Sequence, residues 1–446
     1  KSQGIVFLMS VLFCLGLSVS GNTWIAQASM INLQSSLITS GNDWSGFPSI
    51  SVDGRWVAFA SNATNLVESD NNQTADIFVY DRLTGHIDRA SISSDGLEAN
   101  AISTRPAISA DGRFVAFESL ADNLVPGDIN FLSDIFVHDR LTKNTERVSV
   151  DANGFEGNGW SEQASISADG HYVAFISEAD NLLPNDTNGV PDAFLHNRLS
   201  SYTQRVSIQS DGSQIAGESN AAKVTPSGRT VVFTSQAENQ INANNPQSSI
   251  LSHNRLIPRT MQIPDTGNGV EPDTSTGGQW IAYRLPNDPE SNQHVYVFDQ
   301  LNESTYTARF PVPLTQHAIA NNGKHIAAVG AAIDGRNFNL YWHNIDSGET
   351  IELVKGVSDM RPDISGDGNF VTYVQETNGI PQISVFDRGA QPEPTYFISG
   401  RVIGPLGDPL SLVQIEDNNG NTVETDKLGY FFLSGIKPGQ VSLSLS

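Results

Sequence analysis

Cysteine is almost absent from this chain. The one cysteine, Cys14, lies in the apolar run Ile5–Val19. This run follows a basic residue, is short for a membrane span and precedes a small-residue cleavage pattern at 26–28. We interpret residues 1–28 as a secretory signal peptide, with an uncleaved membrane anchor as the alternative. Once Cys14 is removed, disulfides, thiol nucleophiles and thiolate metal ligands are excluded, which fits a periplasmic or extracellular protein.

Positive charge is also scarce. The chain has 25 Lys and Arg residues against 49 Asp and Glu, a net charge of −24, and its pI is about 4.6. Such a field repels nucleic-acid phosphates and anionic membrane surfaces. We therefore expect no nucleic-acid partner and, after signal cleavage, no membrane insertion. The acidic surface either keeps an exported protein soluble or attracts a cationic partner or metal ions.

Catalytic motifs are missing as well. The sequence has no Gly-x-Ser-x-Gly elbow and no His-Glu-x-x-His pair. Four histidines occupy one position of an internal repeat that elsewhere holds Tyr or Phe, which indicates packing: His138, His196, His253 and His343. No catalytic residue is predicted.

What the chain does contain is a repeat. The stretch Ile108–Arg140 recurs from Ile50 and from Ile166, and its turn aspartates are 58 residues apart in successive copies: Asp53, Asp111 and Asp169. A fixed period of this size is typical of stacked copies of one supersecondary unit.

Each copy carries four strand-like runs. In the second copy these are Pro106–Ser109, Phe114–Ser119, Ile135–Asp139 and Thr145–Val150. An Asp-Gly turn joins the first two runs and favours a tight hairpin. The second run is apolar almost throughout, which predicts burial on both faces, whereas the fourth alternates like an outer strand. We expect the phenylalanines repeated in the second run to be buried: Phe59, Phe117, Phe175 and Phe233.

The pattern continues with drift until seven copies are complete. The seventh copy ends at Arg388 without a fourth strand, and Met30–Ser35 precedes the first copy where a fourth strand would lie. We therefore predict an all-β, seven-bladed β-propeller of four-stranded blades over residues 29–388. Met30–Ser35 should close the ring by pairing with Ile383–Phe386, which hides edges that would otherwise be exposed.

A different region follows the propeller. Residues 389–395 are rich in Pro and Gly and read as a linker. Residues 396–446 contain short strands between Gly-Asp-Pro, Asn-Asn-Gly and Lys-Pro-Gly turns, which favours a β-sandwich. We expect this sandwich to be incomplete, since the sequence stops within an alternating strand.

Two resemblances support this division. Through Ser109–Phe117 and Asp134–Arg140, the repeats resemble the WD-like propeller repeats of TolB-type proteins. That resemblance implies an exported propeller used for protein or ligand contact, although several enzymes carry such propellers. The C-terminal region resembles the carboxypeptidase regulatory-like fold through Gly400–Val402, Asp408–Leu410 and Thr425–Phe432.

One motif offers metal ligands. The pattern Asp-x-Asn-x-x-x-Asp precedes the third strand of the first three copies: Asp70, Asn72, Asp76, Asp128, Asn130, Asp134, Asp186, Asn188 and Asp192. Calcium prefers several oxygen ligands on a flexible loop. Alternatively these residues form Asx-turns that cap the strand entry. Both interpretations stay open, with Ca²⁺ as the candidate cofactor.

The long loops indicate a binding face. Loops between the second and third strands and between blades lie on one side of a propeller, here Asn65–Asp76 and Ser93–Arg105 with their counterparts. We expect a protein or carbohydrate ligand on this face of blades 1–3. Trp44 and Trp160 are candidate aromatic contacts, or they pack at the blade entry.

Two functions remain. The first is a non-catalytic, monomeric, exported binding propeller that contacts a protein, glycan or cell-envelope partner, with the sandwich as a spacer. The second is a propeller hydrolase or lyase for polysaccharide or peptide, with its catalytic groups in the channel or beyond Ser446. An enzyme should gather several titratable groups in the channel. The channel strands, read as PSIS, PAIS, ASIS, AKVT, TST, HAIA and PDIS, supply only Lys223, His317 and Asp363, and this favours binding.

Overall fold

The computed structural model describes most of the chain. It covers residues 6–9, 34–236 and 248–388, apart from gaps at 265, 267–268, 276–277, 286–291 and 333–336, and C-terminal strands at 396–403, 413–417, 422–424, 430–436 and 443–445. All regular elements within these residues are strands apart from one isolated 3-10 position. None of the described residues forms a helix with the length and apolar character needed to cross a membrane.

The chain divides into two compact units. One is Ser35–Asp387, and the other combines Lys1–Gln34 with Arg388–Ser446. The larger unit begins at the second residue of β2 (Gln34–Leu37). It contains blades 1 to 3, whose strands are β3 (Ser45–Ile50), β4 (Trp56–Ser61), β5 (Asp76–Asp81), β6 (Ile87–Arg89), β7 (Ser103–Ile108), β8 (Phe114–Ser119), β9 (Asp134–Asp139), β10 (Asn144–Arg147), β11 (Ser161–Ile166), β12 (Tyr172–Ser177), β13 (Asp192–Asn197) and β14 (Tyr202–Arg205).

Blades 4 to 7 complete this unit. Their strands are β15 (Ser219–Val224), β16 (Thr230–Ser235), β17 (Ser249–Asn254), β18 (Arg259–Gln262), β19 (Val270–Thr274), β20 (Trp280–Arg284), β21 (His294–Asp299), β22 (Ser304–Arg309), β23 (Leu314–Ile319), β24 (His325–Ala331), β25 (Phe338–Asn344), β26 (Thr350–Val357), β27 (Asp363–Ile364), β28 (Phe370–Thr377) and β29 (Ile380–Asp387).

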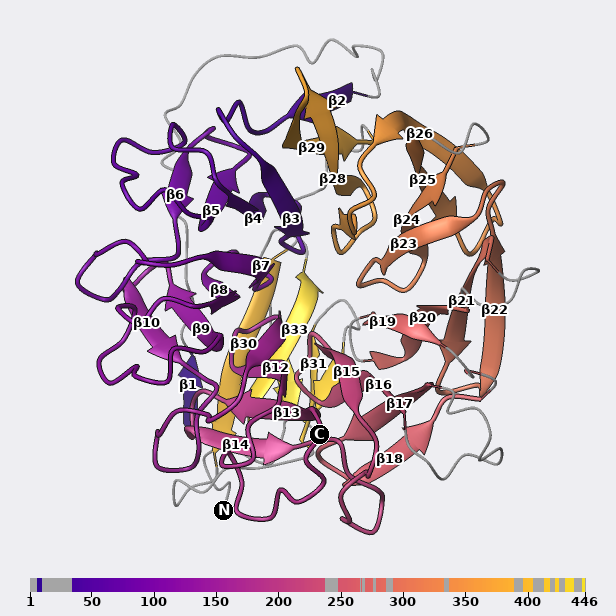
Figure 1. Cartoon of the computed structure of the whole chain (residues 1–446). Coiled ribbons are helices and arrows are strands. Elements are labelled where there is room, and N and C mark those ends of the chain that lie inside the picture. The colour runs from indigo at the N-terminus through magenta and orange to yellow at the C-terminus, as the bar shows by residue number, and fades with distance from the viewer. Residues whose placement is uncertain are drawn as a thin grey trace. The chain divides into compact units, whose positions relative to one another are not determined.

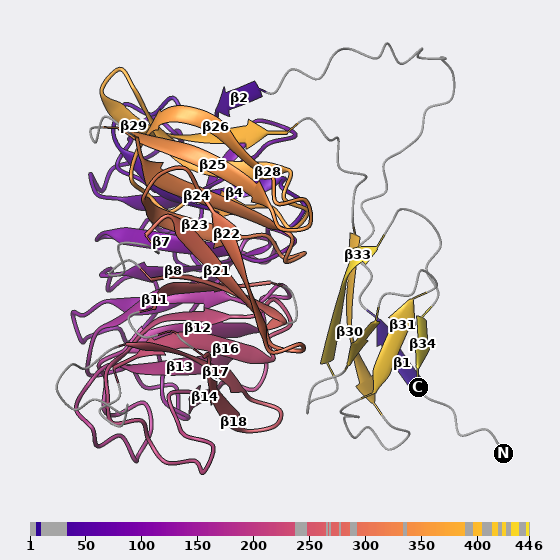
Figure 2. The same cartoon turned by 90° about the vertical axis from the view of Figure 1, so that its right-hand side faces the viewer.

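These strands form a seven-bladed ring, as predicted. Blades 1 to 5 are separate four-stranded antiparallel sheets, whereas blades 6 and 7 join through the β26–β28 pairing of Val357 with Gln375. Figure 1 looks along the axis of the ring, with the first strand of each blade innermost and successive blades following one another. The side view shows the strands of successive blades stacked over one another (Figure 2).

The N-terminal segment closes the ring. β2 lies beside β29 in the last blade (Figure 1), and the Ile38 backbone N–H donates to the Ile383 carbonyl at 2.9 Å. Thr39 Oγ1 donates to Gln382 Oε1 at 2.8 Å and accepts from the Ile383 backbone N–H at 3.1 Å. The expected closure is therefore present, but the pairing strand runs over Gln34–Leu37. Residues 30–33 of the expected strand lie outside the described residues.

The second and third strands of each blade build its core. Phe59, Phe117, Phe175 and Phe233 have no exposed surface, as the repeat predicted. In the first three blades each of these rings stacks on the phenylalanine directly opposite in the third strand, at centroid distances of 5.8, 6.0 and 5.7 Å. Aromatic pairs of this kind stabilise a sheet by about 0.5–1.5 kcal/mol beyond their burial.

The Asp-Gly turns and the Asp-Arg pairs together connect neighbouring blades. Arg140 of blade 2 donates to the Gly112 carbonyl at 2.6 Å, and its guanidinium lies 4.1 Å from the ring centroid of Trp56 in blade 1. A Cβ added to Gly112 would meet Trp56 at 2.2 Å, and Gly112 has a φ of 71°. Both constraints require glycine here. The same contacts recur at three other junctions through Arg82 with Phe370, Arg198 with Phe114, and Arg255 with Tyr172.

The four repeated histidines are structural, as the sequence indicated. His138 is fully buried and its Nδ1 lies 2.8 Å from Thr145 Oγ1, which itself donates to the Ile92 carbonyl of the preceding blade. The threonine therefore accepts from Nδ1–H. Burial lowers the pKa of His138 to about 4, so the ring stays neutral. His196, His253 and His343 make the same contact with a fourth-strand threonine.

The smaller unit contains two three-stranded sheets. One has the order β1–β30–β33 and the other β32–β31–β34. Its strands are β1 (Val6–Met9), β30 (Tyr396–Ile403), β31 (Gln414–Asp417), β32 (Thr422–Glu424), β33 (Tyr430–Ile436) and β34 (Leu443–Leu445). The β-sandwich expected over residues 396–446 stays a prediction. One of the two sheets also contains β1, which lies in the segment interpreted as a signal peptide.

Candidate functional site

The Asp-x-Asn-x-x-x-Asp motif fixes the loop that enters the third strand. In blade 2, Asn130 Oδ1 accepts from the Leu132 backbone N–H at 2.8 Å, which is an Asx-turn. Asn130 Nδ2 donates to Asp134 Oδ2 at 2.9 Å and to the Gly157 carbonyl at 3.0 Å. Asn72 and Asn188 make the equivalent contacts in blades 1 and 3. The structure therefore brings together all nine predicted residues in three equivalent clusters.

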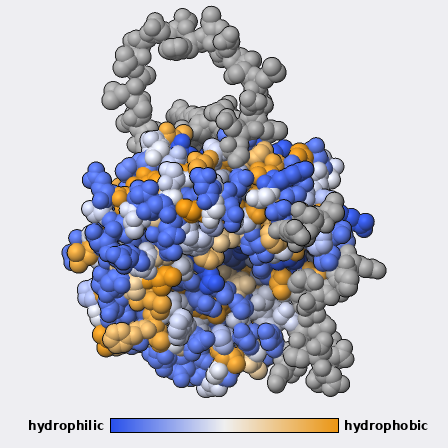
Figure 3. Space-filling view, turned by 45° about the horizontal axis from the view of Figure 1, so that its top comes forward, coloured by the Kyte–Doolittle hydropathy of each residue, from blue (hydrophilic) through white to orange (hydrophobic). Residues whose placement is uncertain are grey.

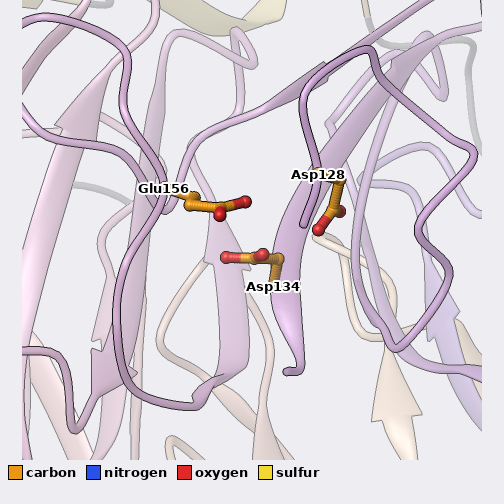
Figure 4. A group of neighbouring side chains, drawn as sticks. All are labelled: Asp128, Asp134 and Glu156. Carbon is orange, nitrogen blue, oxygen red and sulfur yellow. The ribbon is translucent and has the colours of Figure 1, made fainter. Parts of the chain in front are cut away.

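Each cluster holds an arginine that the motif does not include. In blade 2, Arg147 Nη1 lies 3.2 Å from Asp128, 3.3 Å from Asp134 and 2.8 Å from Glu156. The carboxylates of these three acids point toward one another, as Figure 4 shows, and one oxygen from each lies within 4.8 Å of the other two. Arg89 and Arg205 have the corresponding position in blades 1 and 3.

Burial perturbs the acids of these clusters. It raises the pKa of Asp76 and of Asp128 to about 6, against the opposing effect of the neighbouring arginine. The oxygen ligands for a hard cation are thus present, but a guanidinium already supplies positive charge at their centre. A metal ion would have to displace Arg147, so the calcium hypothesis remains a prediction beside the Asx-turn geometry that the contacts display.

A second set of side chains surrounds the central channel. The cavity there has a volume of about 460 Å³ and is lined by the first strand of every blade. Ligand pockets are typically about 300–1,000 Å³ and combine apolar walls with a few convergent polar groups. The channel is therefore large enough to hold a small ligand or the end of a larger one.

A bulge shapes the wall of this cavity. The innermost strands of blades 1 to 5 each shift register once, and one residue beside each shift has a positive φ between 49° and 60°. These residues, which all line the cavity, are Phe47, Arg105, Gln163, Ala221 and Glu271. Bulges re-aim side chains, and strained backbone persists where the surroundings enforce it.

Charged residues from blades 4, 5 and 7 gather at one part of the cavity. They are Lys223, Glu271, Asp273, Arg361 and Asp363. Arg361 Nη2 lies 3.0 Å from Asp273 Oδ2, and Glu271 Oε2 accepts from Arg284 at 2.8 Å. The prediction for the channel strand of blade 5 was wrong, because it placed Thr274–Thr276 in the channel. β19 covers Val270–Thr274 instead, which brings two further carboxylates to the wall.

The charges of this group influence one another. Burial raises the pKa of Asp363 to about 6 and lowers the pKa of Lys223 to about 8. Burial alone would raise the pKa of Asp273 too, but Arg361 and Lys223 hold it below its usual value. The predicted scarcity of titratable groups in the channel is therefore incorrect. Three groups with shifted pKa values, Asp363, Lys223 and Asp273, lie in one cavity, a feature of ligand and catalytic sites.

The two aspartates also have a structural task. Asp363 Oδ2 accepts from the Ile50 backbone N–H of the next blade at 2.8 Å, and Asp273 Oδ2 accepts from that of Ile319 at 2.9 Å. Serine performs the same task at two other junctions, where Ser49 accepts from Ile108 and Ser165 accepts from Val224. This hydrogen bond therefore does not require a negatively charged acceptor. The fold does not need the carboxylates of Asp273 and Asp363 for this task, because serine can replace them.

His317, the third predicted channel residue, is not part of the cavity wall. Its side chain is fully buried, and burial lowers its pKa to about 3. The candidate tryptophans also differ from each other. Trp44 packs edge-on against Phe47 at 5.7 Å, whereas 49% of Trp160 is exposed.

Comparison with known proteins supports the fold alone. No known family description matches the chain, and no curated protein matches its sequence. An oligogalacturonate lyase solved in complex with manganese aligns with a TM-score of 0.57 at 12% identity, over 80% of this chain and 93% of the lyase. The β-propeller domain of the Trilobed protease from Pyrococcus furiosus aligns with a TM-score of 0.53 at 13% identity, over 77% of this chain and 95% of that domain. TolB from Acinetobacter baumannii aligns with a TM-score of only 0.39 at 15% identity, over 88% of this chain and 66% of TolB.

Proposed function

We propose that this protein is an exported β-propeller that binds a short polyhydroxylated ligand, the end of a glycan, in its central cavity. The observation that carries the proposal is the group of charged side chains from blades 4, 5 and 7 on one cavity wall. Lys223 and Arg361 offer donors, while Asp273 and Asp363 offer acceptors. Because both signs of charge are present, this wall suits hydroxyl groups, which donate and accept, better than an ion of one sign.

Isothermal titration with defined oligosaccharides tests the proposal. One set should be neutral and the other should contain uronates. Lys223→Met removes the ammonium group, and Asp363→Ser removes a carboxylate while keeping an acceptor for the Ile50 N–H, as Ser49 does for Ile108. We expect each variant to weaken binding at least tenfold.

A matched control separates the cavity from general charge effects. Lys324 is 58% exposed and pairs with Asp346 on blade 6. Lys324→Met changes net charge as Lys223→Met does, and it should leave binding unchanged. If no oligosaccharide binds, or if Lys223→Met binds as well as the wild type, the cavity is not the ligand site.

A second candidate function is catalysis in the same cavity. It is favoured by the pKa of Asp363, raised by burial to about 6, beside that of Lys223, lowered to about 8, since an acid and a base near neutral pH suit proton transfer. The oligogalacturonate lyase and the Trilobed protease with this fold make a lyase or hydrolase the class to assay. Incubation with oligosaccharides and peptides, followed by chromatography of the products, distinguishes turnover from binding.

Export and the role of the smaller unit belong to the same proposal. We assign residues 1–28 to secretion and residues 396–446 to a carboxypeptidase regulatory-like spacer or adhesion module. Fusion of residues 1–40 to an alkaline phosphatase that is active only outside the cytoplasm should give active enzyme. The mass of the exported product then shows whether the first 28 residues are removed.

A further inference from the structure

The loops at one end of blades 1 to 3 carry charge of a single sign. The β4–β5, β6–β7, β8–β9, β10–β11, β12–β13 and β14–β15 connections all lie at this end, because the strands are antiparallel and these loops alternate with the short turns. They contain no Lys, Arg or His, but thirteen acids: Glu68, Asp70, Asp95, Glu98, Asp122, Asp128, Asp151, Glu156, Glu178, Asp180, Asp186, Asp211 and Glu218. We call these six connections the acidic loop face.

The arginines of the three Asp-x-Asn-x-x-x-Asp clusters are buried and do not add positive charge to the surface of the acidic loop face. Arg89, Arg147 and Arg205 have side-chain exposures of 8, 6 and 6% and are paired with cluster acids. Six of the acids are exposed: Glu68, Asp95, Asp122, Glu178, Asp180 and Asp211. The acidic loop face therefore presents negative charge to the solvent and attracts cationic partners.

Blade 2 places large apolar side chains in the middle of this charge. Ile129, Phe131 and Phe155 are 72, 77 and 69% exposed. Their two loops are tied together, because the Ile129 backbone N–H donates to Glu156 Oε2 at 3.1 Å and Asn130 Nδ2 donates to the Gly157 carbonyl. We call these three residues the blade 2 triplet.

The neighbouring blades show that the fold does not need the triplet. Blade 1 has the same loop contact through Asn71 and Glu98, and blade 3 has it through Thr187 and Gln214. The positions of the triplet are occupied there by Asn71, Gln73 and Leu97 in blade 1 and by Thr187, Gly189 and Ser213 in blade 3. Mostly polar residues therefore serve the same scaffold, and the three apolar side chains of blade 2 are additional to it.

The backbone conformation at Phe131 is a property of the scaffold. Its φ is 57°, and the equivalent residues Gln73 and Gly189 have φ values of 56° and 65°. This left-handed conformation is unfavourable for a bulky residue, so the fold does not favour phenylalanine at this position. Figure 3 shows one face of the molecule, on which hydrophobic residues lie in small groups among hydrophilic ones.

We propose that the acidic loop face of blades 1 to 3 docks a basic protein segment that inserts an apolar side chain at Ile129, Phe131 and Phe155. Charge complementarity selects lysine- and arginine-rich partners, and the triplet selects those with an apolar anchor. This site is separate from the central cavity, so it stands or falls independently of the ligand proposed there.

Three synthetic twelve-residue peptides test this docking site. The first combines Lys and Arg with Trp and Leu, the second replaces Trp and Leu by Ser, and the third replaces the basic residues by Glu. Fluorescence anisotropy should show binding of the first peptide, at least tenfold weaker binding of the second and none of the third. Raising NaCl from 25 to 250 mM should weaken the first interaction, because salt screens exposed charges.

The matched variant copies blade 3 into blade 2 through Ile129→Thr, Phe131→Gly and Phe155→Ser. It should remain folded by circular dichroism and bind the first peptide at least tenfold more weakly. Leu141→Ser, which removes an apolar side chain of 59% exposure from the turn at the opposite end of this blade, should bind normally. If the triple variant does not fold, Phe155→Ser alone should still weaken binding at least threefold.

Three outcomes would overturn the proposal. The triple variant could bind the first peptide as the wild type does, or the acidic peptide could bind equally well. Alternatively, the triplet could be needed for binding to phosphatidylcholine or phosphatidylglycerol vesicles, or for self-association in sedimentation velocity, while no peptide binds. The last result would assign the triplet to a membrane or to a second copy of the chain.

Discussion

Replacing Thr39 and Ile38 tests whether the N-terminal segment holds the ring closed. In Thr39→Val the Ile383 backbone N–H loses its acceptor and Gln382 loses a donor. Leaving a buried polar group without a partner costs about 1–3 kcal/mol. Ile38 is 9% exposed and packs among core residues of blades 1 and 7, so Ile38→Ala should cost a further 2–5 kcal/mol or so.

The combined loss predicts a measurable fall in Tm. With an unfolding entropy of about 2.1 cal/mol/K per residue, a domain the size of Ser35–Asp387 loses roughly 1.4 °C per kcal/mol. The double variant should therefore melt roughly 4–11 °C below the wild type in scans at one heating rate. Since the two residues are adjacent, their effects need not add, and each single variant should be measured too.

Leu37→Ala is the control, because Leu37 lies in β2 but is 46% exposed. This substitution should change the free energy of unfolding by no more than about 0.5 kcal/mol. If Thr39→Val and Ile38→Ala both melt within 1 °C of the wild type, the segment does not stabilise the ring and the closure argument is wrong.

Three further predictions concern the blade junctions, the cavity and the acidic clusters. Gly112→Ala should lower Tm by several degrees because its Cβ would meet Trp56, whereas Gly127→Ala, also at positive φ but with nothing within 4 Å, should cost less. Burial raises the pKa of Asp363 to about 6, so the stabilisation from its protonated form is present below about pH 4 and is lost as the pH rises through 6. In melting scans from pH 4 to 7, the Tm of Asp363→Asn should therefore rise relative to that of the wild type as the pH increases. If a metal binds beside Asp128, millimolar Ca²⁺ or Mn²⁺ should raise Tm relative to chelator and Arg147→Met should enlarge the rise; no shift in either protein would exclude the metal.

The period of the sequence determined most of what could be predicted. Strand spacing gave seven blades, the buried phenylalanines and the structural histidines, because each of these recurs at one repeat position. The closing strand was also predictable, since the seventh copy lacked one. Its bounds were displaced because backbone pairing with β29, rather than side-chain pattern, determines the register of β2.

Residues outside the first three copies were harder to predict. The channel position moves by 58 residues from Phe47 to Arg105, Gln163 and Ala221 but by only 50 to Glu271. Because of this break in spacing, the sequence predicted Thr274–Thr276 as the channel strand and missed Glu271 and Asp273. Arg147 was missed for another reason. Its counterparts Arg89 and Arg205 share the 58-residue period, so the signal was present, but a motif defined by acidic and amide ligands does not include a cation.

The bulged positions of the innermost strands explain how one scaffold could acquire new specificity. A residue at a bulge makes no regular ladder pair, so its side chain can change without disturbing the sheet behind it. The chain already holds phenylalanine, arginine, glutamine, alanine and glutamate at these equivalent positions. Evolution can therefore replace the residues that line the central cavity one position at a time, while the propeller fold is retained.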